Sequence, residues 1–222
     1  MVAAIVAEVR PKMLEFAALL PLFAILGALL IGAISPGPSF VYIVRTSVAQ
    51  SRQDGLGGAL GMGVGAFIYG VLALAGLHTL MSEAGWLYTG LKLAGGLYLI
   101  YLAVKIFRGA KEPVAVGEAA GGAGQVRRSF WRGLATQLSN PKIVAVFGAV
   151  FAALLPQHPP LWLDLAVPPL IFVQETAWYS VVALAFSSPH PRRVYLRAKR
   201  WIDRAAGLVI GALGVRLVLE AR

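Results

Sequence analysis

Six long apolar segments constrain the fold of this 222-residue chain more than any other feature. A bilayer core of about 30 Å needs roughly 20 apolar residues in one helix. The chain is 58% hydrophobic and only 14% charged, which is too little charge for the surface of a soluble domain of this size. We therefore predict an all-α integral membrane protein. The six predicted transmembrane segments are residues 14–34, 55–77, 86–107, 133–155, 161–186 and 201–219.

The positions of the positive charges predict the orientation of the chain in the membrane. The net charge is +10, and the Lys and Arg residues gather in alternate connections between the predicted helices. The connections around residues 79–85 and 156–160 contain none. By the positive-inside rule, the basic connections are cytoplasmic and both termini lie outside the cytoplasm. The three basic connections contain Arg45 and Arg52; Lys105, Arg108, Lys111, Arg127, Arg128 and Arg132; and Arg192, Arg193, Arg197, Lys199, Arg200 and Arg204.

Several classes of function are disfavoured by composition. The basic runs lack the interleaved aromatic residues of a surface that stacks nucleic-acid bases, so no nucleic-acid partner is expected. There is no cysteine, which excludes disulfides, thiolate metal sites and thiol redox chemistry. The three histidines fall in predicted loops. We therefore expect no metal site and no cofactor.

A Gly- and Ala-rich stretch, "EPVAVGEAAGGAGQ" at 112–125, divides the chain into two groups of three helices. Its composition is typical of a flexible linker. The predicted organisation is a first repeat at 1–111, a cytoplasmic linker at 112–128 and a second repeat at 129–222. Three helices is an odd number, so the second repeat must enter the membrane from the opposite side. That is the geometry of an inverted repeat, in which the substrate site lies between the halves at broken helices.

The first helix of each half carries a proline-containing break. Proline removes a backbone N–H and clashes with the preceding turn, and the carbonyls it frees cannot be satisfied by lipid. A single break of this kind would fit an ordinary helix end at the cytoplasmic interface, followed by an amphipathic piece at 40–49. Two matching breaks favour a shared polar cavity, whose depth in the membrane the sequence leaves open. The breaks are Ser35, Pro36, Gly37 and Pro38 in the first half, and Ser139, Asn140, Pro141 and Lys142 in the second.

Four blocks of the sequence together resemble the LysE/RhtB family of bacterial amino-acid exporters. They are "SPGPSFVYIVRTSVAQSRQDGLGGALGMGVG", "LKLAGGLYLIYLAVKIFR", "FWRGLATQLSNPKIVAVFGAVF" and "DRAAGLVIGALGVRLVL". The Ser-Pro-Gly-Pro and Asn-Pro-Lys blocks are the most specific. The resemblance implies a multi-pass protein of the bacterial inner membrane that exports amino acids or related metabolites with the proton gradient. The chain departs from common family patterns at Phe151–Ala152–Ala153–Leu154 and at Ser39.

Three further residues, and Lys142 of the second break, are individual candidates for the transport pathway. On the second helix, Gly57, Gly61 and Gly65 form a small-residue stripe that favours helix packing, and Tyr69 continues it toward the cavity. Lys142 is a candidate partner for a substrate carboxylate, although pairing with a freed carbonyl explains it equally well. Glu175 lies in the middle of the fifth helix, with Tyr179 one turn later on the same face.

An ionised carboxyl at the depth of Glu175 costs about 2.5 to 3.5 kcal/mol on insertion scales, so it must face a polar interior or hold a proton. We hypothesise that Glu175 carries the coupling proton or binds a substrate ammonium; a structural carboxyl is the alternative. For the whole protein, a secondary exporter of zwitterionic or cationic metabolites is the favoured function. A divalent-cation or other ion exporter and an integral-membrane enzyme of similar architecture stay open. The substrate and the oligomeric state stay open too, with a homodimer as one alternative.

Overall fold

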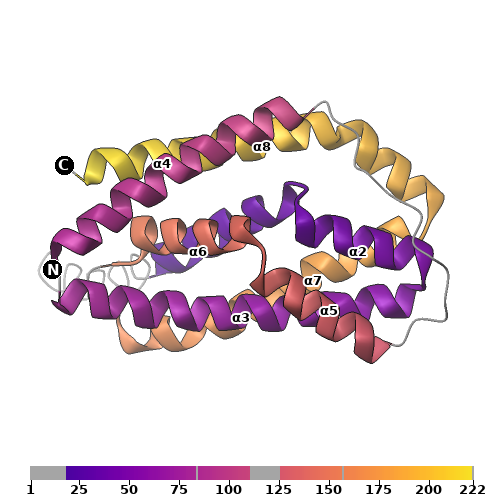
Figure 1. Cartoon of the computed structure of the whole chain (residues 1–222), viewed down its shortest axis with the longest axis horizontal. Helices are drawn as coiled ribbons and strands as arrows, with labels where there is room; N and C mark the ends of the chain where they lie inside the picture. The colour runs from indigo at the N-terminus through magenta and orange to yellow at the C-terminus, as the bar shows by residue number, and fades with distance from the viewer. Residues whose placement is uncertain (1–18, 84, 111–125, 157, 222) are drawn as a thin grey trace, which may run out of the picture.

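The computed structural model describes residues 19–83, 85–110, 126–156 and 158–221, without the side chains at 78–88 and 189–192. The described residues are helical and contain no strand. A first helix, Leu19–Ile34, carries no label in Figure 1 and precedes α2. The labelled helices are α2 (Pro38–Ala49), α3 (Arg52–Glu83), α4 (Gly85–Gly109), α5 (Val126–Leu138), α6 (Pro141–Leu154), α7 (Leu161–Phe186) and α8 (Pro189–Glu220). The predicted linker and residues 14–18 of the first predicted segment lie outside the described residues.

Both predicted breaks are confirmed. The first helix and α2 meet at 58°, and α5 and α6 meet at 57°. Pro38 opens α2 and Pro141 opens α6 at the first helical turn, where a missing N–H costs nothing. Asn140 caps α6, because its Oδ1 accepts a 3.1 Å hydrogen bond from the backbone N–H of Lys142. The two halves therefore begin with helices that are bent by nearly the same angle.

Three single helices among the described residues are long and apolar enough to span a membrane: 52–77 in α3, 89–109 in α4 and all of α7. Each bent pair also passes as one broken span, which gives up to five. The predicted segment 201–219 lies within α8, which is not among these candidates. It carries Asp203, Arg204 and Arg216, and these charges lower its apolar character. An all-α membrane protein is thus supported, whereas the sixth span is not established by helix composition.

Figure 1 shows the two bent pairs running in opposite directions through the molecule, with both breaks near the middle of its long axis. Helices α4 and α8 lie together along one side, and α3 packs against α5 and α7 on the other. The connections from α2 to α3 and from α7 to α8, together with the start of α5, lie at the same end of the molecule. The described parts of the basic connections therefore gather at that end.

Glycines allow close backbone contact at two helix crossings. The predicted packing stripe is confirmed, because side chains added at Gly57, Gly61 or Gly65 would collide with α5. Gly96 of α4 and Gly214 of α8 face each other across the second crossing. A Cβ on either would lie 2.7 to 2.8 Å from the carbonyl oxygen of the other. This reciprocal contact leaves no room for a larger residue.

Gly214→Ala should destabilise the protein by separating α4 from α8. Overpacking of this kind costs about 1–3 kcal/mol, which corresponds to a fall in Tm of roughly 2–12 °C for a chain of this size. Thermal unfolding of the purified protein in detergent measures the fall. Gly90→Ala is the control on α4, because a Cβ there meets no atom within 4 Å. An equal Tm for both variants would contradict the close crossing.

Candidate functional site

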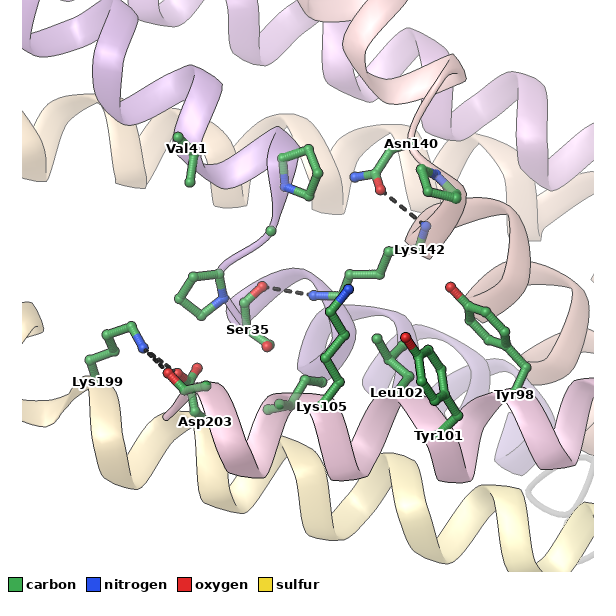
Figure 2. Close-up of a pocket in the computed structure, with 16 residues that line it drawn as sticks. Ser35, Val41, Tyr98, Tyr101, Leu102, Lys105, Asn140, Lys142, Lys199 and Asp203 are labelled. Atoms are coloured by element: carbon green, nitrogen blue, oxygen red, sulfur yellow. Dashed lines mark hydrogen bonds and ion pairs between the residues drawn. The ribbon is translucent and has the colours of Figure 1, made fainter. Parts of the chain in front are cut away.

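The two breaks meet at a cavity of about 360 Å³. Figure 2 shows the backbone of Ser35 to Pro38 on one side and Asn140 to Lys142 on the other. Helices α4 and α8 contribute the facing walls. Seven of the residues predicted for the pathway line this cavity: Ser35, Pro36, Gly37, Pro38, Asn140, Pro141 and Lys142. The structure therefore brings the two predicted breaks into one pocket.

Lys142 joins the two halves across the pocket. Its Nζ donates a 2.8 Å hydrogen bond to the backbone carbonyl of Ser35, which the first break has freed. The same side chain is only partly buried and lines the cavity, as Figure 2 shows. Both interpretations of Lys142 thus fit the structure: it satisfies a freed carbonyl, and its charge faces the space where a ligand carboxylate would lie.

A buried ion pair from α8 closes another part of the pocket. Lys199 Nζ lies 2.7 Å from Asp203 Oδ2 and also donates to the carbonyl of Gly109 at the end of α4, at 3.1 Å. Asp203 Oδ1 is buried and has no hydrogen-bond partner among the described residues. On the wall formed by α4 and α8, Lys105 of α4 also lines the pocket, and its side chain extends toward Lys142 (Figure 2). With three ammonium groups and one carboxylate, the lining carries an excess of two positive charges.

Three buried polar side chains behind the breaks are linked to one another by hydrogen bonds. Asn140 Nδ2 donates to Ser39 Oγ at 2.9 Å, and Ser39 Oγ donates to Gln137 Oε1 at 2.7 Å. All three residues are at most 2% exposed. Gln137 Nε2 has no geometrically defined partner in the described part of the chain. These hydrogen bonds therefore lead from the pocket into the interior and end at the side-chain amide of Gln137.

Glu175 lies at the inner end of this row of hydrogen bonds, next to Gln137. It is 1% exposed, and its Oε2 has no hydrogen-bond partner among the described residues. Its carboxyl interacts with the charge of Lys142 and with the side-chain amide of Gln137. Tyr179 is 2% exposed and interacts with Glu175 and Ser39. Neither Glu175 nor Tyr179 lines the pocket. The carboxyl predicted in α7 thus faces a polar interior and is separated from the cavity by the side chains between them.

Tyr69 is not among the residues that line this pocket. Its hydroxyl donates to the carbonyl of Leu138, the last residue of α5 before the second break. At the first break, Trp178 Nε1 donates to the carbonyl of Ala33 at 3.2 Å. Side chains from α3 and α7 therefore satisfy carbonyls at the two breaks, as backbone away from water requires. Tyr69 thus has a structural role at the second break, and it does not line the cavity.

The polar residues of this site that were not predicted as site residues include Ser39, Lys105, Gln137, Lys199 and Asp203. Gln137 lies three residues before Asn140, so its proximity to the break is a usable signal. Ser39 follows directly after the first break. The pair on α8 falls in a run of basic residues that reads as a cytoplasmic surface, and only the packing of α8 against α4 shows that it is buried.

The family model for the LysE type translocator matches residues 30–221. That range covers both breaks and the four helices that line the pocket. The chain belongs to the LysE type translocator family. It is therefore a membrane transport protein rather than an enzyme.

Curated relatives of this translocator include the threonine efflux proteins of Escherichia coli (strain K12) and Salmonella typhimurium. Each is 35% identical over 193 residues, which cover 86% of this chain and 94% of the relative. An uncharacterized membrane protein of Escherichia coli, YahN, is 32% identical over 203 residues, which cover 90% of this chain and 91% of the relative. No solved structure matches the chain.

Proposed function

We propose that this translocator exports neutral amino acids across the bacterial inner membrane in exchange for protons, with the pocket at the two breaks as the substrate site. The observation that carries this proposal is the single cavity in which the two helix breaks meet. A volume of about 360 Å³ falls at the lower end of the range for ligand pockets, which suits a small metabolite. The threonine efflux relatives supply the substrate class.

The charges around the pocket match the two ends of an amino acid. The carboxylate binds at Lys142, whose Nζ already lies in the lining and can leave the Ser35 carbonyl. The ammonium binds at Asp203, which offers an oxygen with no partner among the described residues. The excess of two positive charges repels cationic side chains. Neutral substrates are therefore favoured over the cationic ones that the sequence left open.

Glu175 is the proposed coupling site. It is buried beside the pocket, and its oxygen Oε2 has no hydrogen-bond partner in the described part of the chain. Each proton that enters through it is driven by about 2.3 kcal/mol per 100 mV of membrane potential. The side-chain amide of Gln137 in α5 interacts with this carboxyl, and Oε2 has no further hydrogen-bond partner among the described residues, which leaves an oxygen that can take up a proton.

The proposed membrane arrangement is six spans in two inverted three-helix repeats, with α8 as the sixth. The antiparallel bent pairs and their similar angles support it. Alternatively, α2 and α5 lie at the membrane interface as short amphipathic helices. At 1.5 Å per residue, however, the 12 residues of α2 and the 14 of α6 extend only about 18 and 21 Å. Helix α6, which the alternative would require to cross the bilayer alone, is thus too short to do so, as is α2.

A fusion after Arg222 should be active with a reporter that works only in the periplasm and inactive with one that works only in the cytoplasm. Six crossings with cytoplasmic basic connections place the C-terminus on the outer face. Paired fusions to a reporter that is active only in the periplasm and one that is active only in the cytoplasm measure the orientation. Fusions within the linker at 112–125 are the control and should give the opposite result. Cytoplasmic activity at Arg222 would rule out six crossings.

A cysteine in place of Ser35 should react with a water-soluble thiol reagent and be protected by threonine. The natural chain has no cysteine, so the label reports this position alone. Ser35 lines the pocket, whereas Ser139 is exposed at the second break and does not line it. Ser139→Cys is therefore the matched control and should show no protection. Equal labelling of Ser35→Cys with and without threonine, glycine or alanine would contradict the substrate site.

A further inference from the structure

The hydrogen bonds between Asn140 and Gln137 have a fixed direction. The backbone N–H of Lys142 can only donate, so the atom of Asn140 that faces it must be Oδ1. Asn140 Nδ2 then donates to Ser39, and the Ser39 hydroxyl is left to donate to Gln137 Oε1. Gln137 must consequently present its Nε2 donor at the far end. The N-cap of α6 thus sets the orientation of every group as far as Gln137.

The group that faces Gln137 is the carboxyl of Glu175. An ionised carboxylate is acceptor-only and matches the Nε2 donor. The other groups that interact with this carboxyl are Lys142 from α6 and Tyr179 from α7. A proton on Glu175 adds an O–H donor. That donor can be satisfied by Gln137 only if the amide turns over and presents Oε1.

We infer that Ser39 and Gln137 form a polarised relay that ties the protonation state of Glu175 to the N-cap of α6 at the second break. When Gln137 turns over, its Nε2 donates to Ser39, and in the proposed relay the Ser39 hydroxyl turns away from Gln137 and donates to Asn140. Only Oδ1 of Asn140 can accept this bond, so the cap to Lys142 N is released. Protonation in the interior therefore loosens the pocket wall. Ser39 and Gln137 are positioning residues, and the inference rests on Glu175 being titrated during transport.

The relay is tested without substrate, so its failure is distinct from failure of the proposed function. Ser139→Cys places a thiol beside Asn140 on the exposed side of the break. Its labelling rate by a maleimide is measured from about pH 5 to about pH 9, a range in which buried carboxyls titrate. The intrinsic pH dependence of the thiol is removed by dividing by the rate in a Glu175→Gln background. The normalised rate should rise about fivefold on protonation, as release of a cap worth about 1 kcal/mol implies.

Ser39→Ala should abolish this normalised change, and Ser39→Thr should restore it by returning the hydroxyl. Ser47→Ala is the matched control, because Ser47 is buried on the same helix but donates to the carbonyl of Ile43. It should leave the change intact. A pH profile in Ser39→Ala equal to that in Ser47→Ala would overturn the relay. So would a normalised rate that stays constant with pH in the unaltered background.

Discussion

Glu175→Gln should reduce proton-driven accumulation of threonine to the equilibrated level. The substitution keeps the shape of the side chain and removes its titration. In proteoliposomes with a membrane potential of about 100 mV, one coupled charge supplies about 2.3 kcal/mol, which supports roughly 50-fold accumulation. The variant should show none of this accumulation. Its exchange of labelled for unlabelled threonine, which needs no net proton transfer, should stay within about twofold of the unaltered rate.

The exchange measurement separates a lost coupling proton from a damaged protein. Glu220→Gln is the control carboxyl, because Glu220 is exposed on α8 and pairs with Arg216 at 2.6 Å, away from the pocket lining. It should accumulate threonine normally. If Glu175→Gln is inserted at normal levels and still accumulates threonine with an unchanged pH dependence, then the coupling proton is carried by another group.

Lys142→Met should weaken threonine binding by about 10- to 100-fold. The substitution removes the charge that we assign to the substrate carboxylate, and a hydrogen bond to a charged group is worth about 1.5–3 kcal/mol. It keeps an apolar side chain of similar length against Gly37. Equilibrium binding of labelled threonine to purified protein gives the Kd.

Lys92→Met is the matched control for this loss. Lys92 lies on α4 outside the pocket lining, 3.8 Å from Glu220 Oε2. Its substitution should change the Kd by less than about twofold. Lys142→Met also leaves the Ser35 carbonyl without its donor, so Tm is measured alongside. A variant with an unchanged Kd would show that Lys142 serves only to satisfy that carbonyl.

Three of the predicted spans and both breaks could be predicted because their causes are local. Apolar length sets α3, α4 and α7, and the predicted segment 161–186 coincides with α7. Proline chemistry sets the breaks at Pro38 and Pro141. The packing stripe at Gly57, Gly61 and Gly65 follows from helical spacing on one face. Each of these features is determined within a few turns of the chain.

The remaining parts of the site depend on contacts distant in sequence. Lys199 and Asp203 are separated from Gly109 by about 90 residues, and nothing local to α8 shows that they would be buried against the end of α4. The bond from Ser39 to Gln137 likewise joins residues 98 positions apart. Tyr69 was predicted to reach the cavity, but its hydroxyl binds the carbonyl of Leu138, because the break frees an acceptor within its reach.

Uptake of labelled threonine into inverted membrane vesicles tests the central claim most directly. Export from the cell becomes uptake in this orientation, so an imposed proton gradient should drive threonine inward above its equilibrium level. The accumulation should collapse when a protonophore is added, and excess unlabelled neutral amino acids should compete better than lysine or arginine. Threonine uptake that equals that of vesicles lacking the protein, or accumulation that is unaffected by the protonophore, would contradict proton-driven export of neutral amino acids.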